Sequence, residues 1–151
     1  MIVYLIRHGH AEDRETFKGS DLDRPLTQKG TDRASVAFKN FLKKFDPPKA
    51  VITSGAVRSV ETASILSELC GVKYEIVKRL NPGADIKDYI ETISDWRHAE
   101  VIAIVGHEPE LSEAVSLITS GGSLRLIMKK GSICVLDGSV LVDLLQQKAL
   151  L

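Results

Sequence analysis

Two short apolar runs in this sequence end in the same way, with a glycine and a histidine. Residues 1–6 (MIVYLI) lead into residues 7–9 (RHG), and residues 101–105 (VIAIV) lead into residues 106–107 (GH). Short apolar runs of this kind are typical of strands that are buried on both faces of a sheet. In open α/β sheets, ligands bind beyond the carboxyl ends of the strands. We therefore expect a layered α/β fold that presents both histidines at its ligand-binding edge.

Strands and helices alternate along the rest of the chain. Apolar residues at helical spacing predict helices over about residues 28–45, 57–70, 86–96 and 110–119. Further strands are expected at 50–54, 74–77, 133–136 and 140–144, with Asp137-Gly138 as the hairpin turn between the last two. This alternation predicts one three-layer α/β domain over residues 1–151, with a mostly parallel central sheet flanked by helices and a C-terminal hairpin.

The composition argues against several broad classes of protein. The 20 lysines and arginines balance 20 acidic residues, which argues against a broad nucleic-acid-binding face. No apolar run reaches the length of a membrane span, and the first run is too short for a signal peptide. Cys70 and Cys134 lie in apolar surroundings in unrelated elements, so we expect free thiols. The expectation is a soluble cytoplasmic protein with no nucleic-acid or membrane partner.

Cationic side chains gather at the predicted strand ends. Arg7 and His8 follow the first strand, and Gly9 allows the backbone to approach a ligand closely. Arg58 lies in the first turn of the helix after the second strand. The helix dipole disfavours a cation there, and a helix N-terminus suits an anion, so a bound anion would explain the arginine. Each residue alone also fits a structural role, as a packed histidine or a solvated arginine.

If Arg7, His8 and Arg58 converge with His107, the four side chains build a pocket for a dianionic phosphoryl group. Arginine forks match phosphate oxygens bidentately, and Arg24, in the polar loop predicted over residues 11–24, could join them. A metal site is a weaker interpretation, because arginines beside the histidines would repel a cation. The sequence has no HxxxH or CxxC spacing and no glycine-rich phosphate loop. We expect neither a metal nor a cofactor.

Several blocks of the sequence form a recognisable set. They are RHG at 7–9, RPLT at 24–27 followed by Gly30, Ser54 with Arg58 and Glu61-Thr62-Ala63, GHEP at 106–109, and a final segment at 131–136. In this order they resemble the histidine phosphatase superfamily, which has the phosphoglycerate mutase-like fold. The resemblance extends over nearly the whole chain. The short length and the RPLT segment are most similar to the SixA-type phosphohistidine phosphatases.

This resemblance implies a metal-independent phosphatase with a histidine nucleophile. His8 would attack phosphorus through Nε2 and become transiently phosphorylated. The groups that would hold the phosphoryl oxygens and stabilise the transition state are Arg7, Arg58 and His107, with Arg24 and Gly9 as further substrate-binding residues. Water would then release phosphate. The implied substrate is a phosphohistidine on a protein.

A general acid is not evident. Many family members supply a Glu or Asp after the third strand, where residues 80–85 of this chain (LNPGAD) show no clear match. The available carboxyls, each of which also fits a solvated loop charge, are Glu12, Asp13, Asp85 and Glu108. An alkoxide needs a proton as it leaves, whereas an imidazole that is protonated beforehand leaves as a neutral group. A site without a strong acid therefore favours phosphohistidine over phosphate esters.

The short chain leaves little sequence for a lid over the site. We therefore expect a shallow, open site that suits a phosphorylated side chain on another protein. Small phosphate esters also enter open sites, which leaves a small-metabolite phosphomonoesterase on the same fold as an alternative. A second alternative is a phosphate-binding domain without turnover, although every expected catalytic position is filled. The sequence leaves the physiological partner and the oligomeric state open.

Overall fold

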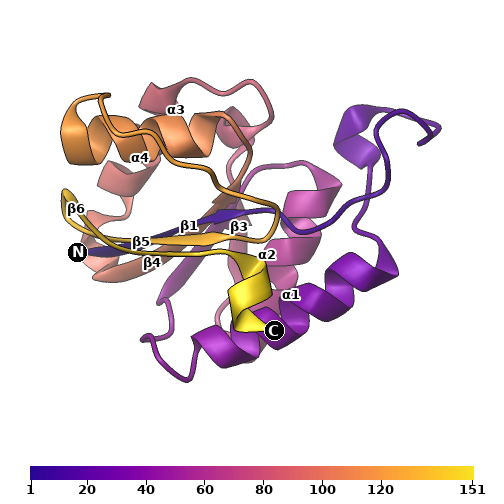
Figure 1. The fold of residues 1–151 in the computed structure, drawn as a ribbon, viewed down its shortest axis with the longest axis horizontal. Coiled ribbons are helices and arrows are strands. Elements are labelled where there is room, and N and C mark those ends of the chain that lie inside the picture. Colours follow the sequence, from indigo (N-terminus) through magenta and orange to yellow (C-terminus); the bar gives the residue numbers. More distant parts are fainter.

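The centre of the molecule is a six-stranded sheet in the order β3-β2-β4-β1-β5-β6 (Figure 1). The structure, a computed structural model, describes residues 1–151. The strands are β1 (Ile2–Arg7), β2 (Ala50–Thr53), β3 (Tyr74–Ile76), β4 (Val101–Gly106), β5 (Ile133–Asp137) and β6 (Val140–Leu145). The first four run parallel to one another, and β5 and β6 add an antiparallel hairpin beside β1. The mostly parallel sheet with a C-terminal hairpin is confirmed.

Four α-helices and four 3-10 helices connect these strands. They are α1 (Gln28–Phe41), α2 (Val57–Cys70), α3 (Ile86–Asp95), α4 (Glu110–Ser120), η1 (Asp21–Asp23), η2 (Lys78–Leu80), η3 (Arg97–Ala99) and η4 (Gln147–Leu150). Thr27 begins α1 by accepting a hydrogen bond from the N–H of Gly30 at 2.9 Å. The prediction that this helix continues to Phe45 is wrong. The chain turns after Phe41, and Phe45 still reaches the core by stacking on the Phe41 ring at 4.6 Å.

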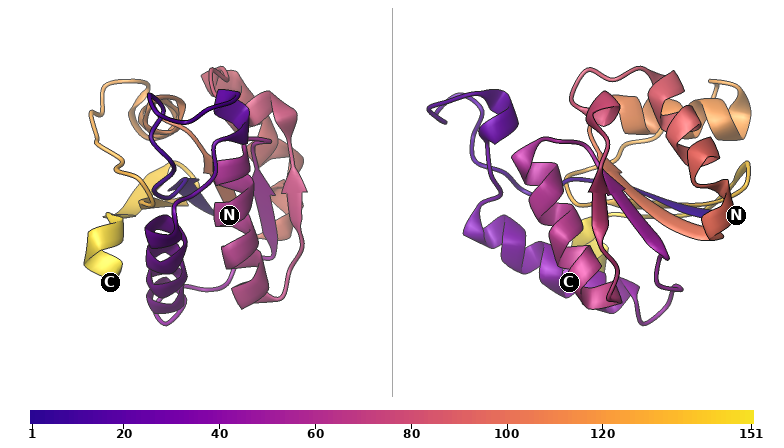
Figure 2. Two further views of the ribbon diagram at one scale, coloured as in Figure 1. Left: turned by 90° about the vertical axis from the view of Figure 1, so that its right-hand side faces the viewer. Right: turned by 180° about the vertical axis from the view of Figure 1, so that it is seen from behind.

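The two faces of the sheet bury separate apolar clusters. In β1, Val3 and Leu5 pack with α3 and α4, whereas Tyr4 and Ile6 pack with α1, α2 and η4. Figure 2 shows these helix layers on opposite sides of the strands. Alternate side chains of a strand point to opposite faces, so a strand covered on both sides must be apolar throughout. This requirement accounts for the uninterrupted apolar run in β1.

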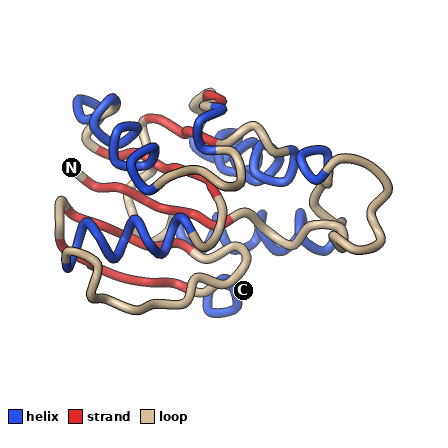
Figure 3. Tube along the Cα trace, turned by 90° about the horizontal axis from the view of Figure 1, so that it is seen from above, coloured by secondary structure: helices blue, strands red, loops and turns tan.

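The carboxyl ends of the central strands lie side by side. Arg7 of β1 pairs with Gly106 of β4, and Thr53 of β2 pairs with Val105. The residues that follow each strand therefore emerge at one edge of the sheet. The segment between β1 and α1, which contains η1, lies at the same edge (Figures 1 and 3). No helix is long and apolar enough to cross a membrane.

Candidate active site

His8 comes directly after β1 and is only 6% exposed. Its Nδ1 lies 2.8 Å from the carbonyl oxygen of Gly9. A carbonyl only accepts, so Nδ1 carries the proton, and the lone pair is on Nε2. Burial, together with the positive charges of Arg58 and Arg7, lowers the pKa of His8 to about 3, against the opposing effect of the Gly9 hydrogen bond. The ring is therefore neutral and has the tautomer that a nucleophilic Nε2 needs.

His107 follows β4 and is held by hydroxyl groups from α2 and the loop before it. Its Nε2 lies 2.7 Å from Ser54 Oγ and 3.2 Å from Ser59 Oγ. Ser54 Oγ also accepts from the N–H of Ala56 at 3.4 Å, so its own proton is free to point at the ring. A hydroxyl that donates to Nε2 favours a proton on Nδ1 of His107, and this Nδ1 is buried and has no hydrogen-bond partner. Burial first, and then Arg58, lowers the pKa of this ring to about 3.

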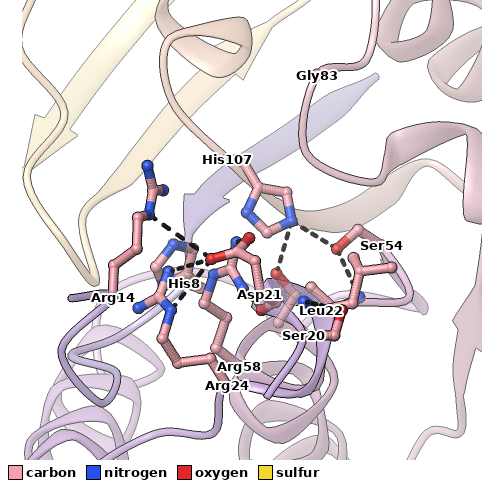
Figure 4. A network of polar contacts seen from close by, with 12 residues as sticks. His8, Arg14, Ser20, Asp21, Leu22, Arg24, Ser54, Arg58, Gly83 and His107 are labelled. Carbon is pink, nitrogen blue, oxygen red and sulfur yellow. Dashed lines mark hydrogen bonds and ion pairs between the residues drawn. The ribbon is translucent and has the colours of Figure 1, made fainter. Parts of the chain in front are cut away.

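The two imidazoles face one another across the site. Their ring centroids are 5.2 Å apart, at an interplanar angle of 50°. They come from neighbouring strands and, among the residues drawn in Figure 4, lie close to Asp21, Arg24 and Arg58. The predicted convergence of segments that are far apart in the sequence is therefore present in the fold.

Arg58 and Arg24 converge on one carboxylate. Arg58 is 1% exposed and donates through Nη1 to the Asp21 carbonyl oxygen at 2.8 Å and through Nη2 to Asp21 Oδ2 at 3.1 Å. Arg24 donates to Asp21 Oδ1 through Nε and Nη2, both at 3.2 Å, and through Nη1 to the carbonyl of Glu12 at 2.8 Å. Arg24 thus joins the cluster from the loop, as expected.

Asp21 is the residue that the sequence analysis missed. Although partial burial raises its pKa, the ion pairs with Arg58 and Arg24 outweigh this effect and lower it, so the carboxylate stays ionised. Figure 4 shows it between these arginines and Arg14, below the His107 ring. The only signal in the sequence is its spacing of three residues from Arg24. Asp21 is thus a carboxylate of the protein itself that lies where Arg58 and Arg24 converge.

Arg7 is anchored differently and has no carboxylate partner. Its Nη1 donates to the carbonyl of Met128 at 2.9 Å, and its Nε is buried without a hydrogen-bond partner. Arg58 Nε and His107 Nδ1 are buried and unpartnered as well. Burying a polar N–H without a partner is costly, which favours an acceptor for each of these groups. A phosphoryl group has several oxygens that can accept from such donors.

Gly9 does not offer a free donor to a ligand. Its N–H donates to Thr62 Oγ1 at 3.1 Å, and its carbonyl holds the His8 ring. A Cβ at this position would lie 3.4 Å from the Leu26 side chain, which is an ordinary contact. Both backbone groups of Gly9 thus have partners within the fold, and its contact with substrate stays a prediction.

The four candidate acids occupy different places. Glu12 and Asp13 line the same cavity of about 700 Å³ as Arg7 and His8. Asp85 caps α3, where it accepts from the N–H of Lys87, and it does not line this cavity. Glu108 accepts from both the N–H and the hydroxyl of Ser112 at 2.8 and 2.7 Å and so holds the first turn of α4. No group of three or more His, Cys, Asp or Glu side chains is placed to hold a metal ion.

Two comparisons with known sequences bear on the family of this chain. The profile described as the histidine phosphatase superfamily (branch 1) matches residues 3–82. An uncharacterized protein of Picosynechococcus sp. is 30% identical over 137 residues, which cover 88% of this chain and 82% of the relative.

Three solved structures share the fold at lower sequence identity. A protein histidine phosphatase SixA complexed with tungstate has a TM-score of 0.83 and 22% identity, with 100% of both chains covered. A protein from Agrobacterium tumefaciens, provisionally assigned as the phosphohistidine phosphatase SixA, has a TM-score of 0.84 and 21% identity, with 95% of this chain and 97% of the other covered. The alpha-ribazole phosphatase of Shigella flexneri has a TM-score of 0.73 and 16% identity, with 91% and 90% covered.

Proposed function

The chain belongs to the histidine phosphatase superfamily, and on that premise we propose that it is a phosphohistidine phosphatase acting on a protein, with His8 as its nucleophile and no metal ion. One observation carries this proposal. The His8 ring is neutral, its Nδ1 proton is fixed by the Gly9 carbonyl, and it faces His107 beside two arginines. A ring held in this way is ready to attack phosphorus through Nε2.

The first chemical step moves the phosphoryl group from the substrate to His8. A bond forms between phosphorus and Nε2 of His8 while the bond from phosphorus to the substrate imidazole breaks. Arg7, Arg58 and the Nδ1 proton of His107 hold the phosphoryl oxygens and stabilise the charge of the transition state. The leaving imidazole, protonated on its other nitrogen, departs as a neutral group. Water then attacks the phosphohistidine and releases phosphate.

The ionised Asp21 supports phosphohistidine over an ester as the substrate. It lies among the cations that would hold the phosphoryl group, but its lowered pKa makes it a poor proton donor. Asp85 and Glu108 are occupied by helix ends. None of these three carboxyls is therefore positioned to protonate an alkoxide, which a phosphate ester requires and a protonated imidazole does not.

A small-metabolite phosphomonoesterase is the second candidate. Glu12 and Asp13 line the cavity beside His8, and either would serve as a proton donor if it pointed at the leaving group. The similarity to an alpha-ribazole phosphatase agrees with this candidate. Both reactions use the same His8 intermediate and differ only in the leaving group.

Turnover of two substrates tests the proposal. We expect cleavage of phosphoramidate or N-phosphohistidine to exceed hydrolysis of a chromogenic phosphate ester by about 100-fold, the scale of a missing general acid. An acid-labile, alkali-stable phosphate on His8 should be trapped by mass spectrometry, and His8→Ala should abolish both activities. Arg58→Ala should lower kcat by about 100-fold or more. Faster ester hydrolysis would favour the phosphomonoesterase, and turnover of neither substrate would favour a phosphate-binding domain.

A further inference from the structure

A second cavity, of about 730 Å³, opens on the other side of Arg7. We call it the basic groove. Its charged and titratable lining consists of Arg7, His10, Arg33, Lys129, Lys130 and Lys148. These residues come from the end of β1, from α1, from the loop before β5 and from η4. Arg7 and Lys130 also line the cavity at His8, so the two spaces lie next to each other.

The positive charge of the basic groove has no internal counter-charge. No carboxylate lines it, and none of its arginines and lysines forms an ion pair. Asp21, in contrast, pairs with three arginines at the neighbouring site. The pKa of His10 is lowered by burial and then by Arg33 and Lys130, which agrees with an uncompensated field. Because the chain as a whole has zero net charge, composition does not explain this concentration.

Neutral side chains build the frame of the groove. Gln146 accepts from the N–H of Lys129 at 3.0 Å and donates to the carbonyl of Ile127 at 2.7 Å. Gln147 is 3% exposed and accepts from Arg33 Nε at 3.3 Å. It packs over Gly131, where a Cβ would lie 2.2 Å from the Gln147 amide nitrogen. The loop before β5 is thereby fixed by amide groups, which leaves the lysine ammonium groups free.

The N–H of Gly131 ties this loop to the catalytic strand. It donates to the carbonyl oxygens of Arg7 at 3.1 Å and of His8 at 2.9 Å. Lys129 and Lys130 are therefore held at a fixed place relative to the nucleophile, although their side chains are exposed. The His8 cavity is also lined by Glu12, Asp13 and Glu15, which belong to the segment between β1 and α1 and flank Arg14. Carboxylates thus line the His8 cavity and are absent from the lining of the basic groove.

We propose that the basic groove binds carboxylate side chains of the phosphorylated protein, next to its phosphohistidine. This inference rests on the proposed function and specifies its substrate as a protein with an acidic surface beside the modified histidine. Exposed lysines spread over a loop and η4 suit an extended acidic surface, whereas a site for a small dianion uses buried arginine forks. Charge complementarity would also help to orient the partner, because its carboxylates are attracted by the groove and repelled by Glu12, Asp13 and Glu15.

Two matched peptides test this proposal. Each carries one phosphohistidine, flanked by glutamates in one peptide and by glutamines in the other. We expect the wild-type protein to show a kcat/KM roughly tenfold higher for the glutamate peptide at low ionic strength, the size expected of a few exposed ion pairs. The preference should shrink in salt, because screening acts over about 10 Å at 0.1 M.

The variant K129Q/K148Q should lower this preference to about threefold or less. The ratio of the two kcat/KM values is the readout, since it is insensitive to a general loss of activity. K43Q/K44Q, which removes two exposed lysines beyond the far end of α1, is the matched control and should keep the wild-type preference. A wild type without preference, or an equal loss in both variants, overturns the proposal.

Binding measurements separate this inference from the proposed reaction. The same two peptides with a non-hydrolysable phosphohistidine analogue are titrated by fluorescence anisotropy, which needs no turnover. A glutamate preference in binding without any turnover would reject the phosphatase and keep the groove. Turnover of both peptides without a glutamate preference in binding would keep the phosphatase and reject the groove. Inhibition by tripolyphosphate that is lost in K129Q/K148Q, with no preference between the peptides, would assign the groove to a small polyanion and overturn the proposal.

Discussion

Burial keeps two imidazoles neutral, and hydrogen bonds favour one tautomer of each. The Gly9 carbonyl keeps a proton on Nδ1 of His8, and the hydroxyl groups of Ser54 and Ser59 at Nε2 of His107 favour a proton on its Nδ1. We expect 15N-edited NMR spectra at pH 6 to show both rings neutral and both as the Nδ1–H tautomer, because burial lowers each pKa to about 3. His8→Asn and His107→Asn assign the signals. A protonated ring at pH 6, or a proton on Nε2 of His8, would contradict the assigned nucleophile.

Asp21 should compete with a phosphoryl group if Arg58 and Arg24 bind that group as proposed. Asp21→Asn removes the negative charge and keeps an oxygen that accepts from Arg58 or Arg24. Because the carboxylate is 41% exposed, screening limits the effect, and we expect orthovanadate to bind about threefold to tenfold more tightly. The inhibition constant of orthovanadate measures this change in affinity, with Asp23→Asn as a neighbouring control. Weaker vanadate binding in Asp21→Asn would mean that Asp21 serves mainly to orient the arginines.

At the scale of an element, the end of β4 depends on a glycine. A Cβ at Gly106 would lie 2.1 Å from the Tyr89 hydroxyl, the group that accepts from the N–H of His107 at 3.2 Å. We expect Gly106→Ala to destabilise the fold by about 1–3 kcal/mol, as overpacking does, and to lower kcat by displacing His107. Denaturant unfolding and turnover measure the two effects.

A double variant shows whether the steric contact is the cause. Tyr89→Leu shortens the side chain that blocks position 106, so the cost of Gly106→Ala should be smaller in its presence. Additive losses in the double variant would place the cause elsewhere in β4.

The sequence predicts the beginning or end of a helix well where contacts between neighbouring residues determine it. Thr27 begins α1 by bonding to Gly30, and Gly71, with a φ of 69°, ends α2. The end of α1 was mispredicted because stacking between Phe41 and Phe45, rather than helical spacing, brings the second ring into the core. Periodicity describes a helix face and contains no information on where tertiary packing ends it.

The candidate site was predictable only in part for the same reason. Arg7, His8, Arg58 and His107 each lie at the end of a strand or the start of a helix, so the parallel topology determines their convergence. Asp21 begins η1, a short 3-10 turn within the long segment between β1 and α1, and its contact with Arg58 spans 37 positions in the sequence. No periodic pattern predicts such a contact, because loop conformation depends on the partners that the fold supplies.

At the scale of the whole molecule, charge is distributed unevenly although it sums to zero. Cations without counter-ions collect around Arg7 and the loop before β5, whereas Glu12, Asp13 and Glu15 line the cavity at His8. Because Arg7 and Lys130 line both spaces, both groups of charges act on whatever approaches His8. A neutral protein with such a distribution of charge would select partners by orientation more than by overall attraction.

Because both histidines are buried in the neutral form, the free energy of unfolding of the whole fold depends on pH. Each ring has a pKa of about 3 when folded, well below the value of about 6.5 of an exposed histidine. Between these values the unfolded chain binds protons that the folded chain does not, so stability is fully present above pH 6.5 and falls as the pH drops towards 3. From pH 7 to pH 5, we expect each ring to lower the free energy of unfolding by about 2 kcal/mol.

Denaturant unfolding at the two pH values measures this loss, in a phosphate-free buffer because a bound anion would stabilise the folded state. His8→Asn should remove about half of the loss that the two rings cause together, since one of the two groups no longer titrates. His98→Asn is the matched control, because His98 is exposed and its hydration changes little on unfolding. An unchanged pH dependence in His8→Asn would show that the folded and unfolded chains protonate this ring at the same pH, and would contradict a lowered pKa of His8. A ring with the ordinary pKa of about 6.5 would be mostly protonated at pH 5, and its Nε2 would then be unable to attack phosphorus.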